Sequence, residues 1–510
     1  MIVLKKENSI LFICVFLITS FPFVRIVPVK ADPEIIRVPT DFPTIQAAID
    51  NANPGAIVYV AKGNYTEHLA INKTLSLIGE DRDTTIIDGF DADTVISISA
   101  DNVVIEGITV LKSVLRTSDT GIRVIGAKGI FISKTKVLNT SAGIIFSSSI
   151  NSLISNSAIL SNYYGLYLLY CNNNSFLNNV FSGNVYAISL YFSIINTFAG
   201  NTLSGDSQGV FLPQTSNRNY FYHNNFMDKA PVISDAQNSW YRGNEGNYWA
   251  NFNFTNRDLN GDGISDELYT IDERNFDYYP LMGAFSEYNI SVGSLTHYVT
   301  IISNSTISDL RFEIGEETGN RIIAFNALGE SGTMGFCRIM IPTALMDRPH
   351  SIADSTGPIP LSLLSASNET HSYIYFSYPH ENMTISIFYS RELALYNELL
   401  DKYGKLQADL QSLNSTYNDL RANYTSGYQT LLNNFNALLQ NMSRLQNDIL
   451  SMNSSLQQSL TNQTDNVQNL RNLTYVFAAL TAAFLITTVY LSSRLYAIKK
   501  PKNHNFDEED

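Results

Sequence analysis

The most regular feature of this sequence is a hydrophobic pattern that repeats every 22 residues. Each unit opens with a small residue and continues as a short strand in which apolar side chains alternate with others. The small residues are Gly121, Gly143, Gly165, Ala187 and Gly209, and successive members differ by 22, as in 143 − 121 = 22. A fixed period of this kind is typical of stacked coils rather than of a closed globule. We therefore predict a parallel β-helix.

The alternation divides each strand into inward-facing and outward-facing positions. Two columns are apolar in every unit and are predicted to point into the helix: Ile122, Ile144, Leu166, Ile188 and Val210, and then Val124, Phe146, Leu168, Leu190 and Leu212. A second strand in each unit carries Ile132, Ile154, Phe176 and Phe198 at the same spacing and slips by one residue to Phe221. The outward column between the first two contains Arg123, Ile145, Tyr167, Ser189 and Phe211.

Asparagine is concentrated between the predicted strands, as in the run Asn172, Asn173 and Asn174. Asn tolerates left-handed backbone and bonds to its own neighbouring backbone, which suits turns. When coils stack, Asn side chains at one turn can also bond to each other along the helix. An Asn-rich disordered tract is the alternative, but the apolar period persists through this region and argues against it.

The residues before the repeat predict a cap for the open end of the β-helix. Thr40 or Asp41 can begin a short amphipathic helix that ends before Pro54. Such a helix is needed because an uncovered coil would expose strand edges and apolar side chains to water.

Both ends of the chain carry apolar segments. Residues 1–31 are predicted to be a secretory signal peptide, because Lys5 and Lys6 precede an apolar run from Ile10 to Phe23 and the small residue Ala31 stands at the expected cleavage site; an uncleaved anchor is the alternative. Residues 473–493 are predicted to form one transmembrane helix. The basic residues that follow place the 494–510 tail in the cytoplasm. We expect a single-pass protein of the cell membrane with an extracellular N-terminal part.

Two further regions lie between the repeat and the membrane segment. Residues 288–390 contain short alternating strands with Gly and Pro turns, which predicts a β-sandwich-like domain. Residues 393–472 carry apolar residues at alternating steps of four and three, which predicts an α-helical coiled-coil stalk and a homo-oligomer. The pattern contains one stutter beside Gly427. A helical hairpin that folds back at Gly427 is the alternative.

The net charge limits the possible partners, and the cysteines indicate free thiols rather than a disulfide. The chain has 47 Asp and Glu against 33 Lys and Arg, and the formal net charge of −14 argues against nucleic-acid binding. Cys171 and Cys337 lie in different predicted domains and are expected to be buried thiols.

Asn-x-Ser/Thr sequons are abundant before the membrane segment and predict a surface glycoprotein. Chance is the alternative in a chain rich in Asn, Ser and Thr. The sequon asparagines are Asn64, Asn72, Asn139, Asn173, Asn253, Asn289, Asn304, Asn368, Asn382, Asn414, Asn423, Asn441, Asn453, Asn462 and Asn472.

Two stretches of the sequence carry a resemblance to known proteins. The run from Pro43-Thr-Ile-Gln-Ala-Ala-Ile-Asp to Ile87-Asp-Gly resembles the start of many pectin-lyase-like right-handed β-helix proteins. Asn247-Tyr-Trp, Asp258-Leu-Asn-Gly-Asp-Gly-Ile-Ser-Asp and Tyr279-Pro-Leu-Met resemble the closing segment of NosD-like proteins, the so-called periplasmic copper-binding group. The resemblance covers residues 35–285 and implies a mainly β protein with a right-handed parallel β-helix there. Its motifs specify the fold well and the activity poorly.

An acidic loop at residues 258–269 has the spacing of calcium ligands. Side-chain oxygens recur at every second position, a backbone carbonyl follows, and a glycine stands after the third ligand. The candidate ligands are Asp258, Asn260, Asp262, Ile264 and Asp266. Tyr269 occupies the twelfth position, where an EF-hand has Glu, so a loop like those of dockerin or thrombospondin repeats fits better. We expect a structural calcium ion, and a solvated acidic turn is the alternative.

The resemblance also raises two activities, polysaccharide cleavage and copper handling. A glycosidase needs paired carboxylates, which the outward column lacks. Copper needs clustered His, Met or Cys, and the histidines of this chain are scattered. Tyr167, Tyr191 and Phe211 could instead stack on sugar rings as ligand-binding residues. Packing under a loop or a neighbouring subunit is the alternative for these three rings.

These observations favour a membrane-anchored surface protein without an evident catalytic site, whose β-helix binds glycans or partner proteins. A carbohydrate-active enzyme of the polysaccharide lyase or hydrolase type is the first alternative. A NosD-like periplasmic copper-handling protein is the second.

Overall fold

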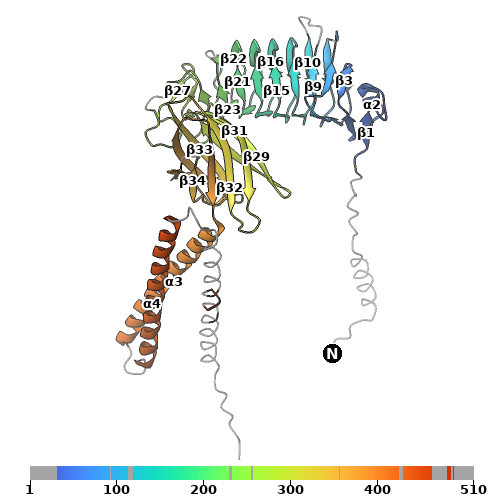
Figure 1. The fold of residues 1–510 in the computed structure, drawn as a ribbon. Helices are drawn as coiled ribbons and strands as arrows, with labels where there is room; N and C mark the ends of the chain where they lie inside the picture. Colours follow the sequence, from blue (N-terminus) through green and yellow to red (C-terminus); the bar gives the residue numbers. More distant parts are fainter. Residues whose placement is uncertain are drawn as a thin grey trace, which may run out of the picture. The chain divides into compact units, whose positions relative to one another are not determined.

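The computed structural model describes residues 32–91, 93–112, 119–228, 232–253, 257–354, 357–423 and 429–461, together with five residues between 479 and 486. The chain forms two compact units, Met1–Asn397 and Glu398–Asp510, and each is described by itself. The first unit contains a parallel β-helix followed by two antiparallel sheets (Figure 1).

Three parallel sheets form the β-helix, and successive coils add neighbouring strands to each sheet (Figure 1). Sheet A contains β1 (Ile35–Val38), β2 (Ile57–Val60), β5 (Ser76–Gly79), β8 (Val104–Glu106), β11 (Phe131–Ser133), β14 (Leu153–Ser155), β17 (Ser175–Leu177), β20 (Thr197–Ala199) and β23 (Tyr220–Tyr222). Sheet B contains β3 (Gly63–Thr66), β6 (Thr85–Asp88), β9 (Thr109–Leu111), β12 (Lys136–Leu138), β15 (Ala158–Leu160), β18 (Val180–Ser182), β21 (Thr202–Ser204), β24 (Asn225–Phe226) and β26 (Tyr248–Trp249). Sheet C contains β4 (Leu69–Ile71), β7 (Thr94–Ile98), β10 (Thr120–Ile125), β13 (Ala142–Ser147), β16 (Tyr164–Leu169), β19 (Tyr186–Tyr191), β22 (Gln208–Leu212) and β25 (Val232–Ser234).

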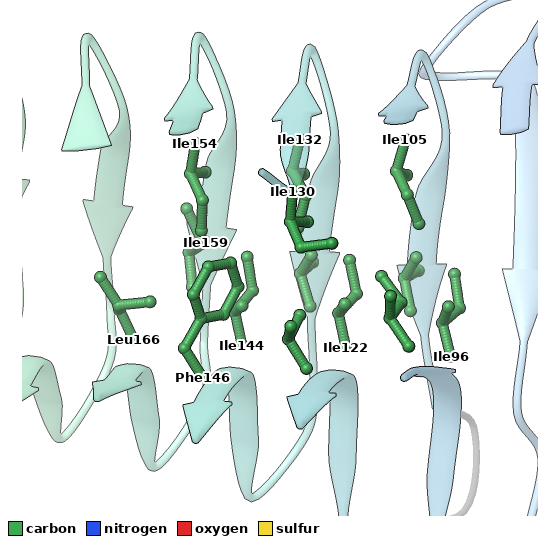
Figure 2. Packing of buried hydrophobic residues seen from close by; sticks show 14 of the residues in the cluster. Ile96, Ile105, Ile122, Ile130, Ile132, Ile144, Phe146, Ile154, Ile159 and Leu166 are labelled. Carbon is green, nitrogen blue, oxygen red and sulfur yellow. The ribbon is translucent and has the colours of Figure 1, made fainter. Parts of the chain in front are cut away.

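The strand register confirms the predicted 22-residue period. Ile122 pairs with Ile144, Ile144 pairs with Leu166, and the same column continues through Ile188 and Val210. Figure 2 shows Ile122, Ile144 and Leu166 in one row inside the coils. These side chains are fully buried, and each contributes roughly 1.5–3 kcal/mol to stability. The predicted one-residue slip is also confirmed, because Phe198 pairs with Phe221.

Small residues open the units because successive coils approach closely there. A Cβ atom at Gly165 would lie 2.6 Å from the carbonyl oxygen of Ala187, and one at Gly143 would lie 2.7 Å from that of Gly165. A larger side chain at these positions would push the coils apart. A small residue, Gly or Ala, at these positions is therefore a requirement of stacking.

Each coil also contains a third strand, which the sequence analysis did not identify. Its buried inward column in sheet B consists of Val137, Ile159, Phe181, Leu203 and Phe226. The spacing is again 22 residues, with one step of 23 (226 − 203). The strands β12, β15, β18 and β21 have three residues each, and so do the strands β11, β14, β17 and β20 of the column that was predicted.

The asparagines between the strands form ladders along the helix, as predicted. In each ladder the side-chain amide nitrogen of one residue donates to the side-chain oxygen of the residue in the next coil. All members are buried, so these bonds satisfy groups that water cannot reach. The ladders are Asn162–Asn184–Asp206, Asn174–Asn196–Asn219–Asn238 and Asn179–Asn201–Asn224–Asn247–Asp277.

Both ends of the hydrophobic core are covered. Helix α2 (Ile45–Asn51) packs at the first coil and buries Ile45, Ala48 and Ile49. Its N-cap is Thr44, whose side chain accepts a hydrogen bond from the nitrogen of Ala47, so the expectation of Thr40 or Asp41 was wrong by one helical turn. At the other end Trp240 stacks on Phe221 at 4.5 Å. A short antiparallel pair, β27 (Tyr269–Thr270) and β28 (Phe276–Asp277), follows.

The chain from Ala284 onward forms two five-stranded antiparallel sheets. One contains β29 (Ala284–Val292), β30 (Leu295–Ser303), β33 (Met334–Pro342), β37 (His371–Pro379) and β36 (Ser362–Leu363). The other contains β31 (Thr306–Ile314), β32 (Arg321–Leu328), β38 (Met383–Tyr389), β34 (Ser351–Ala353) and β35 (Pro358–Ile359). Side chains of both sheets, such as Ile339 and Phe325, share one buried core, which is the arrangement of a sandwich. Cys171 and Cys337 are both buried and free, as expected.

Two long helices follow, α3 (Arg391–Asn423) and α4 (Gln429–Thr461). The Tyr403 hydroxyl donates to the carbonyl oxygen of Met442 at 3.2 Å, and Gln407 donates to Gln446 at 3.4 Å. Both pairs are 39 residues apart, a separation of about 58 Å along one straight helix. The two helices therefore lie against each other within one chain (Figure 1), which favours the hairpin alternative over a continuous coiled-coil stalk. Self-association stays a prediction.

Three predicted segments fall on positions that are not described. The signal peptide (1–31) and the cytoplasmic tail (494–510) lie outside the described residues, and so does most of the predicted membrane segment (473–493). Within the described part of the chain, no helix combines the length and apolar character needed to cross a membrane.

Candidate functional site

The outer face of sheet C carries the outward column that the sequence predicts. Arg123, Ile145, Tyr167 and Ser189 pair in register along the helix, and Ser189 pairs with Phe211. Neighbouring strands of a sheet lie about 4.8 Å apart, so a ring on one coil reaches a ring on the next. The three coils that contain β16, β19 and β22 bring aromatic side chains together on this face.

The structure brings the three predicted ligand-binding residues together. The rings of Tyr167 and Tyr191 stack with 5.2 Å between their centroids. The ring of Phe211 lies 5.7 Å from that of Tyr191. All three side chains are partly exposed, so the rings remain accessible while they pack on each other.

Two more tyrosines belong to the same group. Tyr164 stacks on Tyr186 at 5.3 Å, Tyr164 contacts the edge of Tyr167 at 5.4 Å, and Tyr186 contacts Phe211 at 6.1 Å. Sequence reasoning missed this pair, although each residue directly precedes a small residue of the repeat and the two are 22 apart (186 − 164). We call Tyr164, Tyr167, Tyr186, Tyr191 and Phe211 the aromatic cluster.

Exposed rings flank the aromatic cluster at both ends of its strands. Tyr163 is 48% exposed just before β16, and Tyr170 is 53% exposed just after it. Tyr170 stacks at 4.8 Å on Phe192, which is 46% exposed. Rings that are this exposed and this close to one another are typical of a surface that binds something.

The aromatic cluster is uncharged at neutral pH. Burial raises the pKa of Tyr164, Tyr167 and Tyr191, so their hydroxyls stay protonated and can both donate and accept hydrogen bonds. Ser189 is fully buried between the rings, and its hydroxyl has no hydrogen-bond partner among the described residues. The chemistry of this surface is therefore apolar contact bordered by neutral hydroxyl groups.

Arg123 is the charged residue of the outward column, and it lies two coils away from Tyr167. Its Nη2 donates to Thr120 at 2.9 Å, and within the described part its buried Nε has no partner. Without an acid beside it in the column, Arg123 does not form an acid–base pair for catalysis.

Two acids do meet elsewhere, in the turn between sheets B and C. Asp206 ends an asparagine ladder by accepting from Asn184 at 2.7 and 2.9 Å. Asp228 accepts from the backbone nitrogens of Asp206 at 3.2 Å and Gly205 at 2.7 Å. Burial, reinforced by the charge of Asp228, raises the pKa of Asp206 to about 6. Both carboxylates thus have a structural role, and neither belongs to the outward column.

The calcium-type loop closes on itself. The Asp258 carboxylate accepts from three backbone nitrogens of the loop at 2.8, 3.0 and 2.9 Å. Asn260 and Asp262 each accept from one backbone nitrogen, and Asp266 accepts from Leu259 at 2.6 Å, which joins the two ends of the loop. These contacts fold residues 258–266 into a compact turn, and calcium binding there stays a prediction.

The acidic side chains of this loop are nevertheless too few and too far apart to hold a metal ion by themselves. Among the described residues no three His, Cys, Asp or Glu side chains lie close enough to hold a metal ion. An ion in this loop would therefore depend on Asn260 and on the backbone carbonyl of Ile264 as well as on the acids. The Ile264 side chain itself packs into a small apolar cluster with Leu281 and Phe285.

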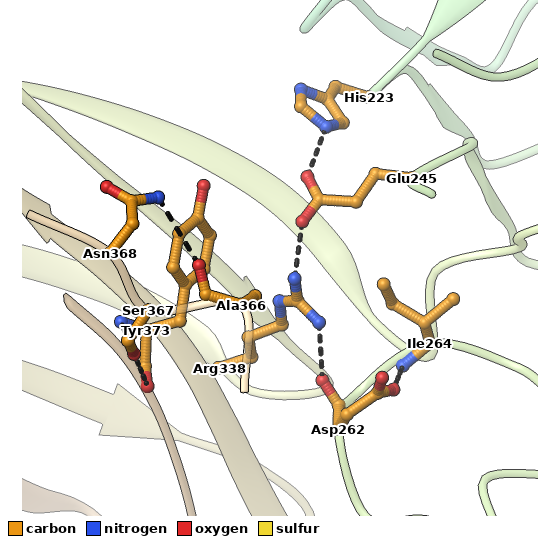
Figure 3. Close-up of polar contacts among 9 residues, drawn as sticks. All are labelled: His223, Glu245, Asp262, Ile264, Arg338, Ala366, Ser367, Asn368 and Tyr373. Carbon is orange, nitrogen blue, oxygen red and sulfur yellow. Dashed lines mark hydrogen bonds and ion pairs between the residues drawn. The ribbon is translucent and has the colours of Figure 1, made fainter. Parts of the chain in front are cut away.

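A chain of part-buried polar and charged side chains joins the β-helix to the sandwich. Figure 3 shows Glu245 between His223, at 2.7 Å, and Arg338 of β33, at 2.5 Å. Arg338 also donates to the carbonyl oxygen of Asp262 at 2.8 Å, so it connects the calcium-type loop to the sandwich. Burial acts to raise the pKa of Glu245, but the hydrogen bonds and charges of His223 and Arg338 outweigh it and lower that pKa. No spacing in the sequence reveals this contact, because Glu245 and Arg338 are 93 residues apart.

The described histidines have separate partners. His223 bonds to Glu245, whereas His380 lies inside the sandwich between Ser305 at 2.8 Å and Thr333 at 2.5 Å. The two rings belong to different parts of the fold, so they do not form the clustered site that a copper ion requires.

Comparison with known proteins agrees with the β-helix. Residues 50–253 match the family model described as periplasmic copper-binding protein (NosD). The described coils and this match agree on a right-handed parallel β-helix, which resembles the pectin-lyase-like folds. No curated protein sequence matches the chain.

Several solved structures resemble part of the chain at low identity. Polygalacturonase from Erwinia carotovora ssp. carotovora is 14% identical, with 42% of this chain and 82% of that chain covered and a TM-score of 0.30. Pectin methylesterase from Aspergillus niger is 15% identical, with 44% and 88% covered and a TM-score of 0.29. The tailspike protein gp49 from Acinetobacter baumannii bacteriophage Fri1, a capsular polysaccharide depolymerase, is 12% identical, with 70% and 84% covered and a TM-score of 0.27.

Proposed function

We propose that this protein is a cell-surface binding protein that holds glycan chains on the outer face of sheet C. The observation that supports the proposal is the aromatic cluster, a set of stacked and partly exposed rings on three consecutive coils. Sugar rings present apolar C–H faces that pack on aromatic side chains, and the tyrosine hydroxyls at the border can bond to sugar hydroxyls.

The size and rigidity of the surface suit a polymer rather than a single small ligand. From Tyr164 to Leu169 the chain advances five residues, or roughly 17 Å along the strand. The rings are held by the coils beneath them, so little side-chain freedom is lost when a ligand binds. A flat neutral surface of this size can contact several sugar units at once.

The test is a glycan array followed by calorimetric titration of the best ligands with the purified full-length protein. The proposal predicts saturable binding of one class of oligosaccharide, with affinity that increases with chain length up to several units. Binding of a partner protein to this face without binding to any glycan would overturn it. The interaction would then be of the protein–protein type.

Cleavage of a bound polysaccharide is a second candidate function, favoured by the pair Asp206 and Asp228. Burial and the neighbouring charge raise the pKa of Asp206 to about 6, and a carboxyl group with a raised pKa can act as a general acid. A reducing-end assay on the glycans that bind distinguishes the two functions. Release of reducing ends that Asp206→Asn abolishes, with binding retained, would establish an enzyme, whereas we expect no release.

Two further features complete the proposal. Membrane attachment rests on the uncharged and mainly apolar sequence of residues 473–491, which is long enough to span a bilayer. Release of the protein from membranes by carbonate at high pH would contradict it.

A structural calcium ion in loop 258–269 rests on the oxygen-rich sequence and on the closure of the loop around Asp258.

A further inference from the structure

The asparagines of the first unit fall into two structural classes, and only one class contains sequons. Every asparagine of the three ladders is buried, and none of them starts an Asn-x-Ser/Thr sequence. Every sequon asparagine that the structure describes in this unit is exposed: Asn64, Asn72, Asn139, Asn173, Asn253, Asn289, Asn304, Asn368 and Asn382. The residue two positions after most ladder asparagines is a buried core side chain, such as Phe181 after Asn179, so these positions do not hold sequons.

Hydrogen bonding further divides the exposed sequon asparagines. The Nδ2 of Asn173 donates to Asn151 at 2.7 Å. The Nδ2 of Asn304 donates to the carbonyl oxygen of Met334 at 2.9 Å, and its Oδ1 accepts from the nitrogen of Phe336 at 2.9 Å. These two side chains would have to give up hydrogen bonds before their nitrogen could be modified.

Five sequon asparagines have no such obstacle. Within the described structure no hydrogen bond involves the side chains of Asn64, Asn72, Asn139, Asn289 and Asn382. Because these residues are exposed, modification of their amide nitrogens breaks no hydrogen bond of the described structure. We call these five residues the open sequons.

We propose that the open sequons carry N-linked glycans and that Asn173 and Asn304 remain unmodified on the folded protein. The co-reactant is a sugar activated as a lipid-linked diphosphate. The bond between the anomeric carbon and the diphosphate oxygen breaks, and a bond from that carbon to Nδ2 forms. Nδ2 loses one proton to the base of the transferase, and the lipid diphosphate leaves, with no change of oxidation state.

None of the open sequons lies in a strand that carries the aromatic cluster, although Asn139 stands in the neighbouring turn, next to Thr140, which accepts from the backbone nitrogen of Tyr163 at 3.2 Å. Asn64 lies in β3 of sheet B and Asn289 lies in β29 of the sandwich, and none of the five lies in a strand of sheet C. The modification does not depend on the proposed glycan binding, because it rests on exposure and on the state of the amide nitrogens.

The test is site-by-site glycopeptide mass spectrometry of the full-length protein purified from its own cells. We expect sugar mass on peptides that contain the open sequons and bare peptides at Asn173, Asn304 and the ladder asparagines. Bare peptides at all five open sequons would overturn the modification. Occupancy of Asn173 and Asn304 equal to that of the open sequons would overturn the selection by hydrogen bonding.

Matched variants separate a sugar on the asparagine from any other added mass. Thr66→Ala and Ser291→Ala remove the sequon hydroxyls of Asn64 and Asn289 while both asparagines stay in place, and both changed residues are exposed. Each should remove the sugar from its own peptide only. Ser294→Ala, an exposed change outside any sequon, should leave every site occupied. Sugar that persists at Asn64 in Thr66→Ala would contradict the proposed chemistry.

Discussion

The side-chain amide of Asn247 donates to a carboxylate oxygen of Asp277 at 3.3 Å, and the longest asparagine ladder ends at this bond. Asp277 also accepts from the backbone nitrogen of Asn247 at 2.7 Å, from the indole nitrogen of Trp249 at 2.9 Å and from the nitrogen of Tyr279 at 3.0 Å. A carboxylate suits this place because it accepts hydrogen bonds without carrying amide hydrogens that would need a further coil.

The buried Asp277 predicts a pH-dependent stability. Burial raises its pKa to about 6, above the value near 3.9 expected in the unfolded chain. Folding thus favours the protonated form of Asp277. The contribution of this group to the free energy of unfolding is full below pH 3.9 and is lost as the pH rises through 6. Asp277→Asn should therefore cost about 1 kcal/mol more at pH 5 than at pH 7.5. Urea unfolding at the two pH values measures the difference, and an equal cost at both would contradict the raised pKa.

The interior of a ladder predicts a large cost for losing one amide. Asn201 donates to Asn224 at 2.9 Å and to the carbonyl oxygen of Phe176 at 2.8 Å, and it accepts from Asn179. Asn201→Ala leaves several buried groups unsatisfied, so we expect a loss of about 2–5 kcal/mol in the free energy of unfolding. The matched control is Asn244→Ala at an exposed position, with an expected change within about 0.5 kcal/mol. Similar costs for the two variants would show that the ladder adds no stability.

The aromatic cluster predicts how single rings affect glycan binding. Tyr167→Ala and Tyr191→Ala should each weaken binding by about 0.5–1.5 kcal/mol, because one stacking surface is lost. Tyr298→Ala removes a ring that is 50% exposed in the sandwich and should leave the affinity unchanged. Calorimetric titration with the best array ligand gives the three affinities. Equal weakening by all three substitutions would show that the outer face of sheet C is not the specific glycan-binding face.

The junction between β-helix and sandwich predicts a strong effect of Arg338. Arg338→Met leaves Glu245 without its buried partner, so we expect a loss of about 3–5 kcal/mol. Combining it with Glu245→Gln should recover part of this loss, since no unpaired charge then remains. Arg311→Ala breaks an exposed pair with Glu313 and should cost less than about 1 kcal/mol. A double variant that is as unstable as the sum of the single variants would exclude coupling between the two charges.

The acidic loop predicts a response to calcium. At a calcium concentration 100 times the Kd, an ion bound only by the folded protein adds about 2.7 kcal/mol of stability. Thermal unfolding with calcium and with a chelator should differ accordingly, and Asp262→Ala should abolish the difference. A melting temperature that is the same in calcium and in chelator would favour the solvated acidic turn.

The fold of the β-helix was largely predictable because every coil repeats the same burial. Ile122 and Ile144 share one environment, so the period exposes the inward column, and the slip at Phe221 is visible for the same reason. The column of Val137 and Ile159 repeats with the same period and was overlooked, although its strands are as short as those of the predicted Ile132 column. The heptad pattern predicted the helices α3 and α4, but it could not decide between a straight stalk and contact of Tyr403 with Met442.

The candidate site was predictable only where it follows the repeat. Tyr167 and Phe211 lie in the outward column, so the alternation identifies them. Tyr164 escaped because the close approach of coils at Gly165 interrupts the alternation and leaves the preceding ring on the outer face as well. The contact between Glu245 and Arg338 depends on how the sandwich meets the β-helix, and short-range patterns carry no information about that.

The ladders have one direction, and this sets how such a protein can change in length. Every side-chain amide donates toward the C-terminal coil, from the hydroxyl-bearing Thr140 through Asn162 and Asn184 to the acid Asp206. A duplicated stretch of 22 residues placed between these ends would meet the same neighbours as the original and add about 4.8 Å to the axis. Evolution or design can therefore lengthen this molecule one coil at a time, while the residues that start and finish each ladder stay fixed.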